Sequence, residues 1–172
     1  LKFPFEESHQ KMVSSGLSGT RNCDWFFSTE GVLLDTAGRY SVYAEDRSEW
    51  LGLLGLLKKS RPKAPINGLI VIVSIAELMS QSPEKSIKLA KNLRARIQDL
   101  TEHLEIFVPV YLVFSKMDLI AGFTEFFECY EVNEFDQVWG TTLTYDPNSA
   151  NNAVELFEQH YSALYDGLKG VS

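Results

Sequence analysis

The feature that most constrains this chain is an apolar run that ends on an acidic turn, Val32-Leu33-Leu34-Asp35-Thr36-Ala37-Gly38. A carboxylate at the end of a parallel strand can hold a magnesium ion through water. A glycine three residues later has no Cβ, so its backbone N–H can approach a phosphate closely. The Asp-x-x-Gly spacing therefore predicts Asp35 as a Mg²⁺ contact and Gly38 as a phosphate contact, although an isolated match is also typical of an ordinary turn.

A second apolar run ends on Ser115-Lys116-Met117-Asp118. The Lys-x-Asp pattern is typical of a loop that recognises a nucleotide base, in which Lys116 lies along the base and Asp118 accepts hydrogen bonds from it. Ser115 is the third candidate on the base side, at a position where asparagine is usual and where the shorter serine side chain cannot bridge the same groups. Ligands of open α/β sheets bind beyond the carboxyl ends of the strands, so Asp35 and Asp118 are expected on one rim.

The hydrophobic spacing around these motifs predicts an α/β fold. Apolar residues recur at helical spacing from Trp50 to Leu57, whereas residues 69–75 are continuously apolar, as in a parallel strand buried on both faces. Alternation of strands with helices predicts a layered α/β fold with a mainly parallel sheet, of the P-loop NTPase-like, small-GTPase-like type. The expected elements are a hairpin over 22–28 and 32–34, strands over 69–75 and 108–114, and helices over 50–59, 83–104, 122–131 and 154–168.

The phosphate-binding part of such a fold is missing from the sequence. No Gly-x-x-x-x-Gly-Lys-Ser/Thr segment occurs, so there is no phosphate cradle and no lysine for the β- and γ-phosphates. Arg39 follows Gly38 where efficient small GTPases place the glutamine that orients water. We therefore assign no catalytic residue, and we expect the phosphate-loop strand and helix to be lacking here. Thr20, in a polar loop, is the candidate for a switch threonine that binds Mg²⁺.

These candidates also have a structural interpretation, in which they bind no ligand. Asp35 would then cap a turn, and Lys116 and Asp118 would form an exposed ion pair, which contributes little to stability.

The amino-acid composition limits the kinds of binding partner and the cellular compartment that we expect. The formal net charge of −7 argues against a nucleic-acid partner, which needs a basic surface. The two cysteines, Cys23 and Cys129, lack metal-site spacing and predict reduced thiols in a cytosolic setting. No apolar run approaches the roughly 20 residues of a membrane-spanning helix, so membrane attachment is expected only through segments outside this chain. We expect part of a larger protein, with a truncated NTPase-like domain over 1–145 and, over 146–172, a C-terminal helix that continues into the rest.

The helix expected over residues 83–104 has a one-sided charge distribution. Lys85, Lys88, Lys91 and Arg94 lie opposite its apolar stripe. Such a face is typical of a solvated helix, and the alternative is a docking face for an acidic partner. The aromatic and acidic segment 122–131 is a second candidate partner surface.

Several blocks of sequence recur in a specific order between about residues 14 and 143. They are Gly19-Thr20-Arg21-Asn22-Cys23-Asp24-Trp25-Phe26-Phe27, the run from Val32 to Tyr40, the run from Trp50 to Leu57, Arg61-Pro62-Lys63-Ala64-Pro65-Ile66-Asn67-Gly68, the run from Ser115 to Phe127, and Gln137-Val138-Trp139-Gly140. Together these blocks resemble the IcmF/TssM family.

The resemblance implies an inner-membrane protein of a bacterial secretion machine, either type VI or Dot/Icm type IV, with a cytoplasmic GTPase-like domain between transmembrane helices. It implies that the phosphate loop, where present, lies just upstream of Leu1. It also implies GTP or ATP with Mg²⁺ as the cofactor of the intact protein, and none for this chain alone. The implied partners are a DotU/TssL-type inner-membrane protein and other components of the secretion complex.

Three functions compete at this point. The leading one is assembly and docking of the secretion apparatus, with nucleotide sensing in the intact protein. The second is an active GTPase or ATPase whose hydrolysis drives assembly. The third is an NTPase-like fold retained only for packing. If the basic helix face docks, charge reversal at Lys88 and Lys91 is expected to weaken binding of the DotU/TssL-type partner.

Overall fold

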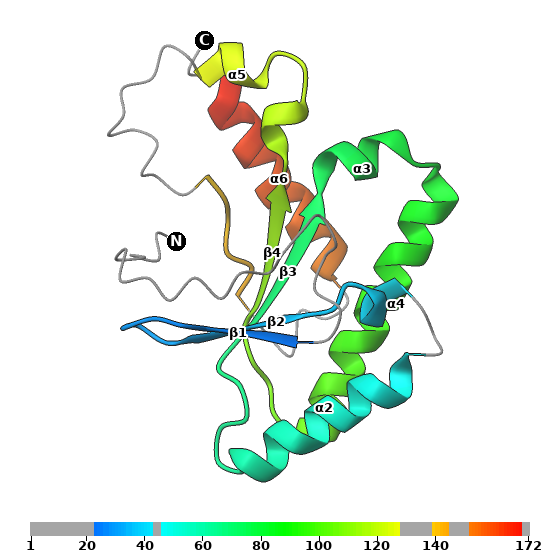
Figure 1. The fold of residues 1–172 in the computed structure, drawn as a ribbon. Helices are drawn as coiled ribbons and strands as arrows, with labels where there is room; N and C mark the ends of the chain where they lie inside the picture. The colour runs from blue at the N-terminus through cyan, green and yellow to red at the C-terminus, as the bar shows by residue number, and fades with distance from the viewer. Residues whose placement is uncertain (1–22, 43–45, 128–138, 145–151, 170–172) are drawn as a thin grey trace. The chain divides into compact units, whose positions relative to one another are not determined.

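The computed structural model describes residues 23–42, 46–127, 139–144 and 152–169. The chain separates into two compact units: residues 3–128 form the larger one, and residues 129–172 with the first two residues form the smaller one. Of the helices and strands described, all but α6 belong to the larger unit (Figure 1). The expected domain division after residue 145 stays a prediction.

The larger unit begins with a β-hairpin, as the sequence predicts. β1 (Cys23–Phe27) pairs antiparallel with β2 (Val32–Thr36), and the register places Asp24 opposite Asp35. Ser28 shapes the turn, because its hydroxyl accepts hydrogen bonds from the backbone N–H groups of the two residues before β2. The turn fixes the register, and the register brings two carboxylates to one face of the hairpin.

β3 (Leu69–Ser74) and β4 (Val110–Ser115) form a parallel pair in which Ser74 lies opposite Ser115. Both strands lie where the continuous apolar runs predict them. β3 ends one residue earlier than expected, because Ser74 caps the short helix α3 (Ile75–Ser80) by accepting a hydrogen bond from the Glu77 N–H. The sequence analysis missed α3, although serine followed three residues later by glutamate is typical of a helix start.

Three helices enclose the core of the larger unit. They are α1 (Arg39–Val42), α2 (Arg47–Ser60) and α4 (Pro83–Leu104), and α4 contacts both of the others. The predicted starts and ends of α2 and α4 are confirmed to within a few residues. Ser82 is the N-cap residue of α4, but its side chain makes no capping hydrogen bond there.

The core lies where the apolar faces of these helices meet. Leu54, in the middle of α2, is only 1% exposed, which agrees with the helical apolar spacing in the sequence. Along α4 the predicted stripe is buried only toward the C-terminus, and Ile87 near the start of the helix is exposed. The buried apolar residues described are Ala37, Tyr40, Trp50, Leu54, Leu57, Leu100 and Leu104.

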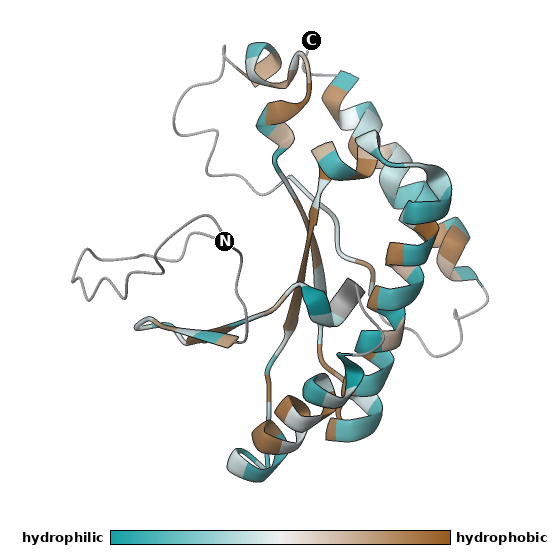
Figure 2. Ribbon diagram, turned by 45° about the vertical axis from the view of Figure 1, so that its right-hand side comes forward, coloured by the Kyte–Doolittle hydropathy of each residue, from teal (hydrophilic) through white to brown (hydrophobic). Residues whose placement is uncertain are grey.

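The strands β3 and β4 are apolar (Figure 2), and apolar side chains on both faces of the pair are exposed. Ile72 on one face is 66% exposed and Leu112 on the other is 54% exposed. The expectation that residues 69–75 are buried on both faces is therefore wrong for the described structure. The pattern correctly identified a strand that is apolar on both sides, but β3 and β4 pair only with each other in the part of the chain described.

The sheet arrangement also differs from the prediction. The described strands form two two-stranded sheets, one antiparallel and one parallel, instead of a single mainly parallel sheet. The α/β class is confirmed. The apolar pattern of a strand predicts that it pairs, but not which strands join one sheet.

The remaining elements are short, apart from α6. η1 (Met117–Leu119) and α5 (Phe123–Phe127) follow β4 in the larger unit, and the rest of the helix expected over 122–131 lies outside the described residues. α6 (Ala153–Lys169), in the smaller unit, confirms the helix predicted over 154–168, and Phe157 stacks on Tyr161 along it. Within the described ranges, no helix combines the length and the apolar character needed to cross a membrane.

Candidate functional site

The carboxyl ends of β3 and β4 bring together two distant parts of the chain. Ser74 and Ser115 are the last residues of the two strands and are register partners. The chain then turns at Lys116, whose backbone is left-handed with φ 59°, and enters η1, which contains Asp118. A non-glycine residue in this conformation is uncommon. The three residues predicted to lie on the base side, from Ser115 to Asp118, thus share one tight turn beyond the parallel strands.

Glu77 on α3 is the direct partner of Lys116. The Lys116 Nζ donates a hydrogen bond to Glu77 Oε1 at 2.7 Å, and both side chains are more than half exposed. The hydrogen bond and charge of Lys116 hold the pKa of Glu77 below its ordinary value. Glu77 was not among the residues predicted for the site. An exposed pair of this kind is worth at most about 1 kcal/mol, so a ligand could displace it at small cost.

An open apolar hollow of about 390 Å³ lies between α3 and the segment that includes η1. Met79 and Leu119, one from each side, are large apolar members of its lining and are both exposed. Apolar hollows of this size can accept a side chain or ring from a binding partner. The lining residues are Ala76, Met79, Ser80, Leu119, Ile120 and Ala121.

We expect Lys116→Met to raise the pKa of the Glu77 carboxyl toward its ordinary value of 4.5. Because the folded-state pKa of Glu77 is lowered, the contact stabilises the fold above pH 4.5 and is lost as the pH falls through the lowered pKa. NMR titration of the Glu77 side chain measures the shift. Lys58→Met is the matched control, since Lys58 pairs with Glu105 instead. A Glu77 pKa that responds equally to both changes would contradict the contact.

Asp35 and Gly38 lie in the other sheet and in the turn that follows it. Asp35 is an exposed residue of β2, and Gly38 is exposed just before α1. In the described residues β2 pairs only with β1, and β4 pairs only with β3, so Asp35 and Asp118 do not share an edge of one sheet. The expectation of a common rim is not met, because the antiparallel hairpin holds Asp35 and no described strand connects the two sheets. Thr20 lies outside the described residues.

The hairpin places Cys23 near two acidic side chains, which the sequence analysis did not foresee. Burial is the main cause that raises the pKa of the Cys23 thiol, and the charges of Asp24 and Asp35 raise it further. The thiol therefore stays protonated at neutral pH. Across the described ranges, no three His, Cys, Asp or Glu side chains are grouped so that they could hold a metal ion.

The turn after β4 carries two of the residues predicted to lie on the base side. Lys116 and Asp118 place a cation and a carboxylate within one turn, and both groups can form hydrogen bonds with polar atoms. The sequence contains no glycine-rich lysine loop to cradle phosphates.

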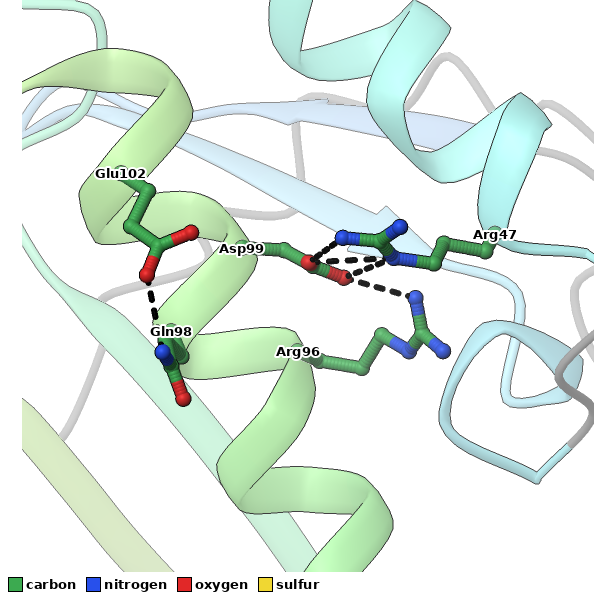
Figure 3. Close-up of polar contacts among 5 residues, drawn as sticks. All are labelled: Arg47, Arg96, Gln98, Asp99 and Glu102. Carbon is green, nitrogen blue, oxygen red and sulfur yellow. Dashed lines mark hydrogen bonds and ion pairs between the residues drawn. The ribbon is translucent and has the colours of Figure 1, made fainter.

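A separate ionic cluster holds α2 against α4 (Figure 3). Asp99 on α4 is 7% exposed and accepts hydrogen bonds from Arg47 at the start of α2, including one of 2.5 Å from Nη2. Arg96 donates to the other carboxylate oxygen at 2.8 Å. The Asp99 carboxylate raises the pKa of Arg47. Both carboxylate oxygens of Asp99 are occupied, so the cluster is a structural lock between helices. The sequence analysis missed it because its partners are 52 residues apart.

The fold and the site define an α/β domain in which a charged turn follows a parallel strand pair and the apolar faces of that pair are open. Residues 43–171 match the model of the IcmF-related N-terminal domain, and the chain belongs to this family.

The chain is also similar to a type VI secretion system component, TssM1 of Pseudomonas aeruginosa. The two are 40% identical over 169 residues, which is 95% of this chain and 15% of that relative. The chain therefore spans only a small part of the relative's length. No solved structure matches the chain.

Proposed function

We propose that this chain is a docking module in the cytoplasmic part of a type VI secretion inner-membrane protein of the TssM type, and that it acts in assembly of the secretion apparatus. Its membership of the IcmF-related family and its similarity to a type VI secretion component support the setting. The partner we propose is the DotU/TssL-type inner-membrane protein, with other components of the complex. Membrane attachment is assigned to segments outside this chain.

The observation that carries the docking role is the open β3–β4 pair. Parallel strands are normally covered on both faces, and a two-stranded sheet is marginal by itself. The apolar residues of β4 and, on β3, Ile70 and Ile72 are 40–66% exposed, whereas the other apolar residues of β3 are partly buried. A contiguous apolar surface of this kind marks a place where another polypeptide binds.

We further propose that the two sheets are parts of one NTPase-like sheet. β2 and β3 each have one edge with no paired strand in the described part of the chain. A strand between these edges, such as the phosphate-loop strand that the family resemblance implies, would join the sheets and bring Asp35 and Asp118 to one rim. It would also pair with the backbone edge of β3 that has no paired strand in the described part of the chain.

In that assembled sheet the intact protein would sense GTP or ATP with Mg²⁺. Ser115, Lys116 and Asp118 would contact the base. Gly38 would contact a phosphate, and Asp35 and Thr20 would contact Mg²⁺. The alternative function is hydrolysis that drives assembly. The displaceable ion pair at Lys116 favours sensing, because it leaves the lysine available to a ligand at small cost.

The experiment that separates docking from nucleotide turnover uses Asp118→Asn in the full-length protein. Calorimetry with GTP and ATP measures binding, and secretion is scored in the same strain. If the domain docks without using a nucleotide, Asp118→Asn leaves secretion unchanged. Tight nucleotide binding that is lost together with secretion would overturn docking alone and would show that assembly requires the nucleotide. Glu30→Gln, which neutralises an exposed carboxylate in the turn between β1 and β2, is the matched control.

A further inference from the structure

The first three turns of α4 carry a cationic surface that takes no part in the core. Lys85, Lys88, Lys91 and Arg94 are exposed there, in a chain whose net charge is −7, and Glu84 in the first turn is the acidic residue among them. All the buried residues of α4 lie at its other end, from Asp99 onward. In the described structure the side chains of Lys88, Lys91 and Arg94 are exposed and form no ion pair or hydrogen bond.

One apolar side chain stands among these cations. Ile87 is 55% exposed. Ile87 lies at the edge of the apolar stripe nearest the basic residues. Lys91 is one turn after it, Arg94 is two turns after it, and Lys88 is one turn before Lys91, so the four residues lie within about a third of the helix circumference. We call these four residues the α4 patch. In the α4 patch, one exposed apolar side chain lies beside basic side chains. Many protein interfaces have a similar arrangement, with an apolar residue at the centre and polar residues at the rim.

The geometry points to an acidic polypeptide segment as the occupant of the α4 patch, one that presents carboxylates around a single apolar residue. This inference builds on the docking role proposed above and names the chemistry of one partner. Opposite charges across an interface raise the association rate and exclude basic competitors. Three unpaired cations that share one face around Ile87 are complementary to such a segment.

A lipid surface fits the α4 patch less well. Helices that lie in a membrane interface need a wide apolar face. The wide apolar face of α4 includes Leu100 and Leu104, which are buried in the core against α1 and α2. Only Ile87 would remain as an apolar contact for the lipid.

The test uses the full-length protein in its own bacterium, with a photo-crosslinking amino acid in place of Lys91. The crosslinked peptide is sequenced. We expect an acidic segment that contains an apolar residue. A phospholipid adduct, a neutral or basic segment, or no adduct would each overturn the proposal.

The second arm reverses charges. Lys88→Glu with Lys91→Glu is expected to weaken binding of the crosslinked partner about tenfold, and Ile87→Ala about fivefold. Lys59→Glu with Lys63→Glu makes the same charge change on exposed residues of α2 and of the loop that follows it, and is expected to leave binding unchanged. Changing two carboxylates of the partner segment to lysine should restore binding to the reversed patch. Failure of this restoration would overturn the proposal.

These experiments distinguish failure of the α4 proposal from failure of the proposed docking role. If charge reversal in the patch leaves assembly and secretion intact while a change on the β3–β4 faces abolishes them, only the α4 proposal fails. If both changes leave assembly and secretion intact, the docking role itself fails.

Discussion

Asp99→Ala is expected to lower the free energy of unfolding of this chain by about 3 kcal/mol. Asp99 is the shared partner of Arg47 and Arg96. Its removal leaves the Arg96 side chain, which is 14% exposed, without a carboxylate, and the Arg96 Nε has no partner in the described structure. A buried charge that loses its counter-ion is costly because it cannot regain water without opening the helix contact. Urea denaturation followed by circular dichroism measures the change.

Glu102→Ala is the matched control for Asp99→Ala. Glu102 lies on the same helix one turn later, is exposed, and accepts a hydrogen bond from Gln98 at 2.8 Å. Its removal should cost less than about 0.5 kcal/mol. Replacing Asp99 and Arg96 together by leucine should recover much of the loss, because apolar packing can substitute for a buried ion pair. Equal effects of the two alanine changes would show that the ionic cluster does not hold the helices together.

Ile72→Lys is expected to reduce secretion by the full-length protein at least about tenfold without lowering the thermal stability of the domain. Ile72 lies in the middle of β3 and is mostly exposed in this structure, so lysine costs the fold little. In the docked state the same change buries the lysine charge against an apolar surface of the partner, which is unfavourable. Secretion, co-purification of the partner and the melting temperature are measured together.

Leu56→Lys is the control for Ile72→Lys. Leu56 on α2 is 64% exposed, close to the value for Ile72, but it belongs to a helix surface rather than to the open sheet. It should leave secretion and stability unchanged. If Ile72→Lys instead unfolds the domain, another part of the same polypeptide covers this face, and the proposal that a partner covers it is wrong.

Local sequence was a good guide to the individual elements. Trp50, Leu54 and Leu57 recur at helical spacing, and all three are buried in α2. The continuous apolar runs predicted β3 and β4, and the hairpin was expected where β1 and β2 lie. These predictions succeed because a helix or strand is decided mainly by the periodicity of its own side chains and by the residues at its ends.

The candidate site could be predicted only in part. Ser115, Lys116 and Asp118 are neighbours in sequence, so their common turn followed directly from the motif. Glu77 was missed because it comes from a different segment, 39 residues earlier than Lys116. The N-cap residue Ser74 was a usable signal for the start of α3. However, no local pattern indicates which lysine a surface glutamate will pair with.

The sequence by itself determined the family, the α/β class and the positions of most helices and strands. The tertiary structure alone decided three things: that Asp35 lies in a different sheet from Asp118, that Asp99 locks two helices together, and that the β3–β4 faces are open. Local periodicity shows which side of an element is apolar. It does not show what covers that side, because coverage depends on contacts between residues that are distant in the chain.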